Sequence, residues 1–163
     1  MKKINLLMII VVFLAIGACA PKVDMEVEKT NIKTVVDQFT QIWETMDLEL
    51  FSKTIAHSPD MVNFGTDADE RWVGWENLEK AIIQQMAVFE EGTVVIRDQV
   101  IKLSDTGKTA WFSEVTDWDL IVQGEAVSMK DCRITGVLEK QNDNWVIVQF
   151  HFSLPVIGQA VEY

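Results

Sequence analysis

Apolar positions recur every three or four residues between residues 32 and 46, and this period predicts an amphipathic helix. Thr30 or Asn31 is expected to cap its start. A shorter second helix is predicted after Asp47, and a third helix over residues 75–90. The apolar stripe of the first helix consists of Ile32, Val35, Val36, Phe39, Ile42, Trp43 and Met46.

The period changes from helical to extended after Gly92, which we expect to end the third helix. A short strand is predicted at residues 61–64, ahead of that helix. Four longer strands are predicted over residues 93–103, 109–122, 125–140 and 145–153. Their short polar turns favour an antiparallel meander, and helices followed by such strands indicate an α+β domain. We expect a curved antiparallel sheet wrapped around three N-terminal helices, with a conical cavity between them.

Residues 1–18 have the layout of a secretory signal peptide, because Lys2 and Lys3 precede an apolar run too short for a stable transmembrane helix. The closing Ile-Gly-Ala-Cys resembles a bacterial lipobox, in which Cys19 is lipidated and becomes the amino terminus. An ordinary signal peptide with a chance cysteine is the alternative. The alanine and proline after Cys19, with no aspartate, resemble outer-membrane sorting signals. We predict a protein held by lipid in the bacterial cell envelope, at the outer membrane facing the periplasm.

The rest of the chain is divided into a tether, one domain and a tail. Residues 19–29 are charged and unpatterned and are predicted to be a tether, residues 30–157 the domain, and residues 158–163 the tail. The whole chain has six tryptophans and eight phenylalanines, of which only Phe13 lies in the predicted signal peptide, and this number suits one domain with a substantial core. Once Cys19 is lipidated, Cys132 has no partner, so no internal disulfide is expected.

The balance of charge limits the classes of partner. The chain has 25 acidic and 14 basic residues and a formal net charge of −11. Loss of the signal peptide would remove two lysines and no acidic residue, which makes the net charge more negative. A chain this acidic repels phosphate backbones, so no nucleic-acid partner is predicted. No Gly-x-Ser-x-Gly motif, phosphate loop or dinucleotide fingerprint occurs in the sequence, and no cofactor is expected.

The sequence FGTDADERWVGW, residues 64–75, places several acids between aromatic residues. An EF-hand loop counted from Asp67 would need glycine at its sixth position and glutamate at its twelfth, where this chain has Trp72 and Leu78. The two histidines lie far apart with no cysteine beside them, so no metal site is predicted. We expect instead a turn whose acids lie near the third helix, with Arg71 paired to one of them.

Two predicted strands carry candidate chemistry at the end of the chain. Side chains alternate along a strand, so Gln149 and His151 should share the face of Trp145. Asp131 and Arg133, in the preceding strand, should lie beside them. An arginine, an aspartate and a histidine that converge in an apolar hollow could polarise a carbonyl or move a proton. The alternative is an Arg–Asp pair on the outer face and a histidine that is merely hydrogen-bonded.

The strand over residues 109–122 adds a carboxylate between aromatic residues. Glu114 should share one face with Trp118, and Trp111 should lie on the other face. A carboxylate beside aromatic rings can have a raised pKa and act as an acid or base near neutral pH. The alternative is a solvated carboxylate, and the sequence leaves open which face is inside.

Two segments carry a resemblance to a known family. HSPDMVNFGTDADERWVGWENL resembles the helix–strand–loop segment of SnoaL-like proteins, in the nuclear transport factor 2-like superfamily, and RITGVLEKQNDNWVIVQFHFSLP resembles their closing hairpin. The resemblance implies a cone-shaped fold, with Trp72 and Trp75 beside its mouth. It leaves the chemistry open, since the family includes isomerases, dehydratases, polyketide cyclases and binding domains. The oxyanion-binding tyrosine of related ketosteroid isomerases is missing, because Tyr163 is the only tyrosine.

We predict from these features a pocket that binds a small, largely apolar molecule. The alternatives are an isomerase, dehydratase or hydrolase that uses the same pocket, and a non-catalytic module that forms a homodimer. Predicted ligand-binding residues are Phe64, Trp72, Trp111, Trp118, Arg133, Gln149 and His151. The candidate catalytic residues are His151 and Glu114 as bases and Arg133 as the electrostatic stabiliser.

Overall fold

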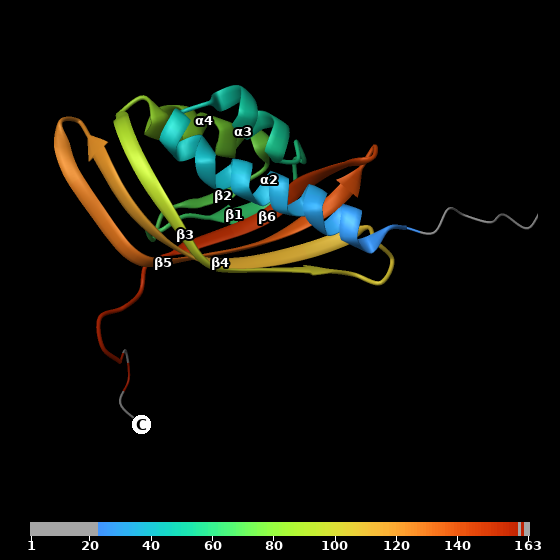
Figure 1. The fold of residues 1–163 in the computed structure, drawn as a ribbon. Helices are drawn as coiled ribbons and strands as arrows, with labels where there is room; N and C mark the ends of the chain where they lie inside the picture. Colours follow the sequence, from blue (N-terminus) through green and yellow to red (C-terminus); the bar gives the residue numbers. More distant parts are fainter. Residues whose placement is uncertain (1–22, 160, 162–163) are drawn as a thin grey trace, which may run out of the picture.

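The computed structural model describes residues 23–159 and residue 161, which form one sheet with the helices on one side (Figure 1). The elements are α2 (Met25–Thr45), α3 (Leu48–Thr54), β1 (Val62–Phe64), β2 (Arg71–Val73), α4 (Trp75–Met86), β3 (Phe89–Leu103), β4 (Thr109–Val122), β5 (Glu125–Gln141) and β6 (Asn144–Ser153). The predicted signal peptide and Cys19 lie outside the described residues.

Within residues 23–159, no helix combines the length and the hydropathy that crossing a membrane requires.

The six strands form a single sheet in the order β2-β1-β6-β5-β4-β3. The predicted α+β class is confirmed, as is the antiparallel meander of β3 to β6. The sheet as a whole is mixed, because β1 runs parallel to β6 and pairs Phe64 with His151. β2 was not predicted, and its antiparallel pairing with β1 defines it.

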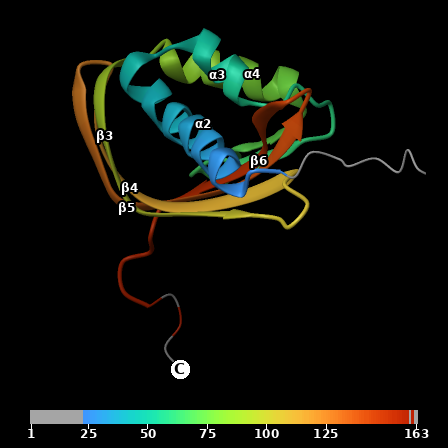
Figure 2. The ribbon, with the colours of Figure 1, turned by 45° about the vertical axis from the view of Figure 1, so that its right-hand side comes forward.

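The long strands bend, so that the sheet curves around the helices, and α2 crosses the concave face (Figure 2). The register shifts in β3 between Arg97 and Val100, and β5 has an irregularity opposite Thr116–Trp118. Asp98 and Asp131 have positive φ values of 49° and 56° at these places. Because bulges bend strands and increase their twist, these irregularities produce the curvature that the cavity requires.

The first helix begins earlier than predicted. The side chain of Asp24 caps α2 and accepts hydrogen bonds from the backbone N–H groups of Glu26 (3.1 Å) and Val27 (3.2 Å). Thr30, one of the predicted caps, instead donates its hydroxyl to the carbonyl of Glu26 inside the helix. Helix α2 therefore includes residues 25–29, which the sequence pattern placed in the tether.

The third helix ends earlier than predicted, at Met86, and β3 already begins at Phe89. Gly92 is therefore not the end of a helix but a strand residue that pairs with Leu120 of β4. A Cβ on Gly92 would collide with Leu120 Cδ2. The glycine allows this close approach across the sheet, a requirement that its position in the sequence did not reveal.

A bulge in β6 reverses the predicted faces of that strand. Ile147 pairs with Leu138 and Gln149 with Val137, which leaves Val148 without a partner in β5. The alternation therefore restarts: Trp145 and Ile147 are buried, and Phe150 continues their face, while His151 is exposed. The prediction that Gln149 and His151 share the face of Trp145 is wrong for this reason.

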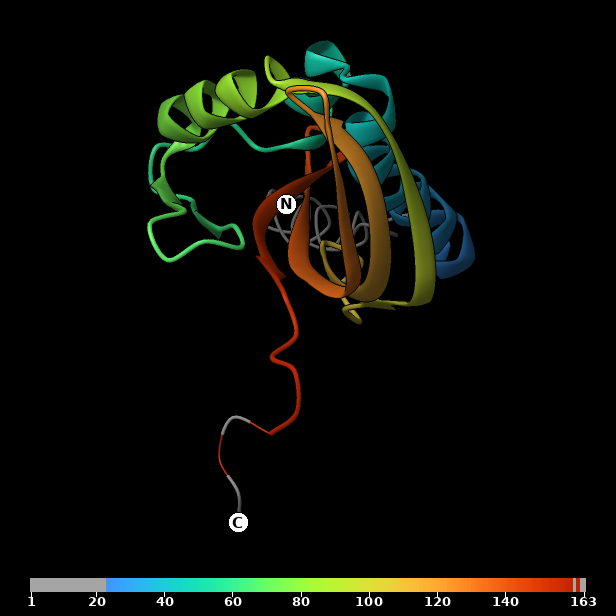
Figure 3. The same ribbon diagram turned by 90° about the vertical axis from the view of Figure 1, so that its left-hand side faces the viewer.

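The core lies between the concave face of the sheet and the three helices. From α2 it takes Ile32, Val36, Phe39 and Ile42, from α4 Leu78, Ile82 and Met86, and from the sheet chiefly Phe112, Trp118, Leu120, Ile134, Leu138, Trp145, Ile147 and Phe150. The predicted apolar stripe of the first helix therefore faces the sheet as expected. Figure 3 shows α4, β1 and β2 on one side of the long, curved strands and α2 on the other. The end bordered by α4 and the β1–β2 loop, where the cavity described below lies, is called the open end of the cone.

Candidate functional site

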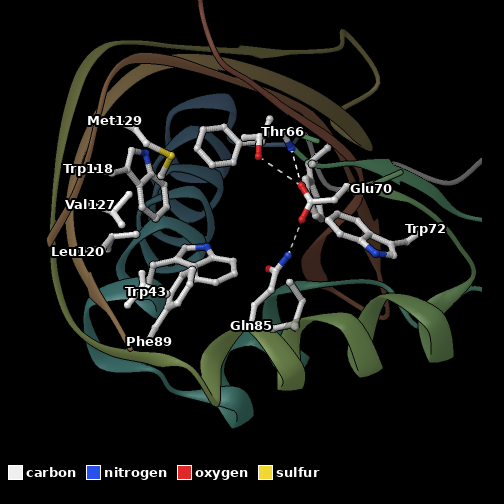
Figure 4. Close-up of a pocket in the computed structure, with 15 residues that line it drawn as sticks. Trp43, Thr66, Glu70, Trp72, Gln85, Phe89, Trp118, Leu120, Val127 and Met129 are labelled. Carbon is white, nitrogen blue, oxygen red and sulfur yellow. Dashed lines mark hydrogen bonds between the residues drawn. The ribbon is translucent and has the colours of Figure 1, made fainter. Parts of the chain in front are cut away.

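A cavity of about 340 Å³ lies at the open end of the cone, between the sheet, α4 and the loop before β2 (Figure 4). This volume lies near the lower limit for small-molecule sites, which is roughly 300 Å³. The cavity is lined by Trp43, Gly65, Thr66, Glu70, Trp72, Ile82, Gln85, Phe89, Trp118, Leu120, Val122, Val127, Met129, Phe150 and Phe152. Most of these side chains are apolar, and their polar exceptions come together on one side.

Aromatic rings from four elements form the wall opposite the loop. The ring centroid of Trp43, on α2, lies 5.7 Å from that of Phe89 and 6.0 Å from that of Trp118, to which it is edge-on. The ring of Phe152 lies 5.2 Å from Trp118. Trp118 Nε1 donates to Thr116 Oγ1 at 2.7 Å, so this buried indole has its polar atom satisfied within β4. The wall therefore offers ring surface to the cavity.

Glu70 forms the polar side of the cavity together with Gln85 and Thr66 (Figure 4). Its Oε2 accepts the backbone N–H groups of Thr66 (2.7 Å) and Asp67 (3.1 Å), and its Oε1 accepts Nε2 of Gln85 (2.8 Å). The Glu70 carboxylate thus binds the beginning of its own loop and connects that loop to α4 through Gln85. Two backbone amides and the half-buried amide side chain of Gln85 fix its position at the cavity wall.

Gly65 makes this arrangement possible. A Cβ at residue 65 would collide with Glu70 Oε2 and would lie 2.6 Å from Cη2 of Trp72. The absent side chain therefore lets both the carboxylate and the indole pack against the backbone of the loop. Glu70 and Trp72 thus both pack against Gly65 at the same corner of the cavity.

The acidic stretch divides between cavity and solvent. Asp67 and Asp69 are exposed, while Glu70 is half-buried at the cavity. The expected ion pair of Arg71 is not formed with any residue in the described part of the chain. Among residues 23–159 and 161, no group of three or more His, Cys, Asp or Glu side chains could hold a metal ion. The stretch therefore contributes one oriented carboxylate to the site.

Two of the seven predicted ligand-binding residues, Trp72 and Trp118, line the cavity. The other five do not: Phe64, Trp111, Arg133, Gln149 and His151. Trp111 is 48% exposed on the convex face of the sheet. The bulge at Val148 turns Gln149 and His151 to that face as well, where the His151 ring packs on Phe64 with centroids 5.6 Å apart.

The predicted convergence of arginine, aspartate and histidine does not occur. Arg133 is exposed, and its Nη2 donates to the carbonyl of Leu154 at 3.0 Å. Asp131 is bound by a different arginine, since Arg97 Nη2 donates to Asp131 (2.9 Å) and to Asp117 (2.8 Å). The alternative stated for this region was an Arg–Asp pair on the outer face of the sheet. Asp131 does pair with an arginine, but with Arg97 in place of Arg133.

Glu114, the third candidate for catalysis, is buried at 2% exposure but lies outside the cavity lining. It accepts hydrogen bonds from Thr40 Oγ1 (2.8 Å) and Gln99 Nε2 (2.9 Å), between α2 and the sheet. Burial is the main cause of its raised pKa. The predicted sharing of a face with Trp118 is confirmed, because both are buried in β4. The carboxylate is a core group rather than one that a ligand touches.

Sequence reasoning missed several lining residues for identifiable reasons. Trp43 belongs to the apolar stripe predicted for the first helix, which carries no sign of a ligand site, and strict alternation from Trp145 puts Phe150 and Phe152 on the opposite face of β6. Gln85 had a detectable signal, because it lies three residues after Ile82 and so falls on the apolar side of α4. A polar side chain on such a face is a candidate for a site.

Comparisons with known proteins agree on the fold. A family model described as SnoaL-like domain matches residues 32–157. A nuclear transport factor 2-like superfamily protein from Salmonella enterica serovar Typhimurium has a TM-score of 0.73 at 18% identity, covering 85% of this chain and 99% of that one. A proposed dehydratase of the NTF2-like family from Streptomyces avermitilis has a TM-score of 0.71 at 16% identity, covering 80% and 98%. No curated protein matches the sequence.

Proposed function

This chain belongs to the SnoaL-like domain family, and we propose that it binds a small, largely apolar molecule in the cavity at the open end of the cone. The observation that carries the proposal is the cavity itself: about 340 Å³ of space with an aromatic wall and one fixed polar corner. Apolar walls supply most of the affinity of such sites, and a few polar groups orient the ligand. Glu70, Gln85 and Thr66 are the orienting groups here.

The placement of the candidate catalytic residues favours binding over catalysis. His151 and Arg133 are exposed on the other side of the sheet, and Glu114 is enclosed by the core, so a ligand in the cavity meets none of them. General acid–base catalysis requires the group within hydrogen-bond reach of the proton that moves. The chemistry expected from these three residues is therefore not supported by their positions.

Catalysis in the same cavity is the second candidate function, and the observation in its favour is Glu70. A carboxylate fixed at an apolar cavity can accept a proton from a bound molecule. The Streptomyces avermitilis protein is described as a proposed dehydratase, and a Novosphingobium aromaticivorans protein of the same fold as a proposed scytalone dehydratase. Isomerisation or dehydration by Glu70 would leave a chemically changed ligand, whereas binding alone would not.

We also propose that lipid on Cys19 anchors the chain in the cell envelope, at the outer membrane facing the periplasm. The support is the sequence of residues 1–19, a basic start and an apolar run that end in Ile-Gly-Ala-Cys. Mass spectrometry of the protein from its host tests this directly. A mature amino terminus at Cys19 with attached acyl chains is the expected result, and an unmodified Cys19 contradicts the anchor. Homodimerisation stays a prediction.

Native mass spectrometry tests the binding function. The chain from residue 20 onward, which contains the whole described core, is purified from its own host and sprayed under non-denaturing conditions. A retained small molecule, released on denaturation, is the expected result. A Leu120→Trp variant, designed to fill the cavity, should lose that molecule, whereas Trp111→Ala on the convex face should retain it. Equal retention by both variants would place the molecule elsewhere and contradict the proposal.

A further inference from the structure

The charge of the cavity is one-sided. Glu70 is the one residue with a charged side chain among the described residues that line the cavity. No lysine, arginine or histidine lines it, and within the described chain Glu70 forms no salt bridge. Hydrogen bonds to neutral groups hold this carboxylate without neutralising its charge. A negative charge beside an apolar cavity favours a ligand that supplies the opposite charge.

The hydrogen bonds of Glu70 leave room for such a ligand. A carboxylate has about four acceptor positions, two on each oxygen. Oε2 accepts the N–H groups of Thr66 and Asp67 and a longer bond of 3.4 Å from the Thr66 hydroxyl. Oε1 accepts one hydrogen bond among the described residues, from Gln85 at 2.8 Å. A position on Oε1 therefore remains for a donor that enters the cavity.

The aromatic groups around the carboxylate are suited to a cation. The Trp72 ring and the Glu70 carboxylate pack on the same side of Gly65, and the edge of the cone opposite them carries Trp43 and Trp118 (Figure 4). Tryptophan faces attract ammonium groups through their quadrupole more strongly than other aromatic side chains do. Trp72, beside the carboxylate, would therefore attract a cationic head, and the rings of Trp43 and Trp118 on the opposite wall would cover an apolar body.

We propose that the ligand of this cavity is a small organic amine, bound as a cation, whose ammonium group donates to Glu70 and whose apolar body lies against the aromatic wall. The inference rests on the proposed binding function and specifies the class of ligand. Carboxylates of the same shape are excluded, because they would meet an unpaired negative charge. The net charge of −11 acts in the same direction at longer range.

Matched probes separate the class of ligand from binding itself. Isothermal titration calorimetry with the chain from residue 20 onward uses three apolar bodies, hexyl, cyclohexylmethyl and 2-phenylethyl, each as amine, alcohol and carboxylate. We expect the amine of at least one body to bind about tenfold or more tighter than its alcohol, since hydrogen bonds to charged groups are the stronger ones. The carboxylate should bind most weakly.

Glu70→Gln is the decisive variant. A glutamine can keep the loop, with its amide oxygen accepting from Thr66 and Asp67 and its amide nitrogen donating to a rotated Gln85. The variant should lose the preference for the amine while its affinity for the alcohol changes less than about threefold. Glu76→Gln, which removes the same charge from an exposed position of α4, should keep the preference.

The outcomes distinguish the two proposals. Alcohols that bind as tightly as amines, or an amine preference that survives in Glu70→Gln, would overturn the inference and leave the binding function standing. If no amine of any body binds while native mass spectrometry finds a retained molecule that is not an amine, the inference is overturned and the binding function stands. If no probe binds and no molecule is retained, the binding function fails and the inference fails with it.

Discussion

Glu28 connects the beginning of α2 to the β5–β6 hairpin. Its Oε2 accepts the indole Nε1–H of Trp145 at 2.7 Å, and its Oε1 accepts Nζ of Lys140 at 2.6 Å. Glu28 is 8% exposed and Trp145 is 4% exposed, so both the carboxylate and the indole N–H lie in the protein interior. We predict that Glu28→Ala destabilises the fold far more than removal of an exposed glutamate from the same helix.

The magnitude follows from the two hydrogen bonds. Without the carboxylate, the buried N–H of Trp145 has no acceptor, which costs about 1–3 kcal/mol. The bond to Lys140 contributes less than a fully buried ion pair, because the Lys140 side chain is 24% exposed. We expect the free energy of unfolding to fall by about 2–4 kcal/mol, a large part of the 5–15 kcal/mol typical of a domain.

Urea titration followed by tryptophan fluorescence measures this loss, with the chain from residue 20 onward at pH 7. Glu26→Ala is the control, because Glu26 lies in the same turn and its pair with Lys29 is exposed. Such a surface pair is worth at most about 1 kcal/mol. If Glu28→Ala costs no more than Glu26→Ala, the assignment of Glu28 as a buried anchor is refuted.

The pH dependence gives a second readout. Hydrogen bonds from Lys140 and Trp145 are the main cause of the lowered pKa of Glu28. A lowered pKa means that the unfolded chain binds this proton more readily than the folded one. The stabilisation is therefore complete above the ordinary glutamate pKa and is lost as the pH falls through the folded value. The difference between wild type and Glu28→Ala should shrink on acidification, and a constant difference would contradict the ionic part of the argument.

Glu114→Gln should stabilise the fold at neutral pH and above. Burial raises the pKa of Glu114, so the stability that its protonated form contributes is lost as the pH rises from the ordinary glutamate pKa through the raised folded value. The same urea titrations from pH 4 to 8 check it, and a variant no more stable than wild type at pH 8 would argue against the burial cost. Gly136→Ala should destabilise the fold by about 1–3 kcal/mol through overpacking, because its Cβ would lie 2.5 Å from Cε1 of Phe112 and 2.8 Å from the carbonyl oxygen of Gln149. Thermal unfolding measures that loss, and an unchanged Tm would mean that the strand can shift to admit a methyl group.

The elements of the fold could be predicted because local periodicity determines them. The stripe of α2 and the alternation of β4 each need only one buried face, and neighbouring residues in the chain establish it. The meander of β3 to β6 follows from short turns between strands. The family resemblance added the curvature of the sheet, which no pattern of single residues expresses.

The site was less predictable, because three of its determinants are not local. The bulge at Val148 depends on the register between β5 and β6, and one extra residue moved Gln149 and His151 out of the predicted site and Phe150 and Phe152 into it. Trp43 reaches the cavity only because α2 crosses the concave face. The sequence does not distinguish Glu70 from Asp67 and Asp69. Only the folded loop, in which the Glu70 carboxylate packs against Gly65, shows which of the three acids borders the cavity.

The sequence by itself determined the order of helices and strands, the acidic charge and the amphipathic faces, because each depends on residues close together in the chain. Only the tertiary structure decided which of those faces enclose the empty space and which carboxylate borders it. The physical reason is that a cavity exists between elements: strand register, sheet curvature and helix packing set its walls, and each brings together residues that lie far apart in the sequence.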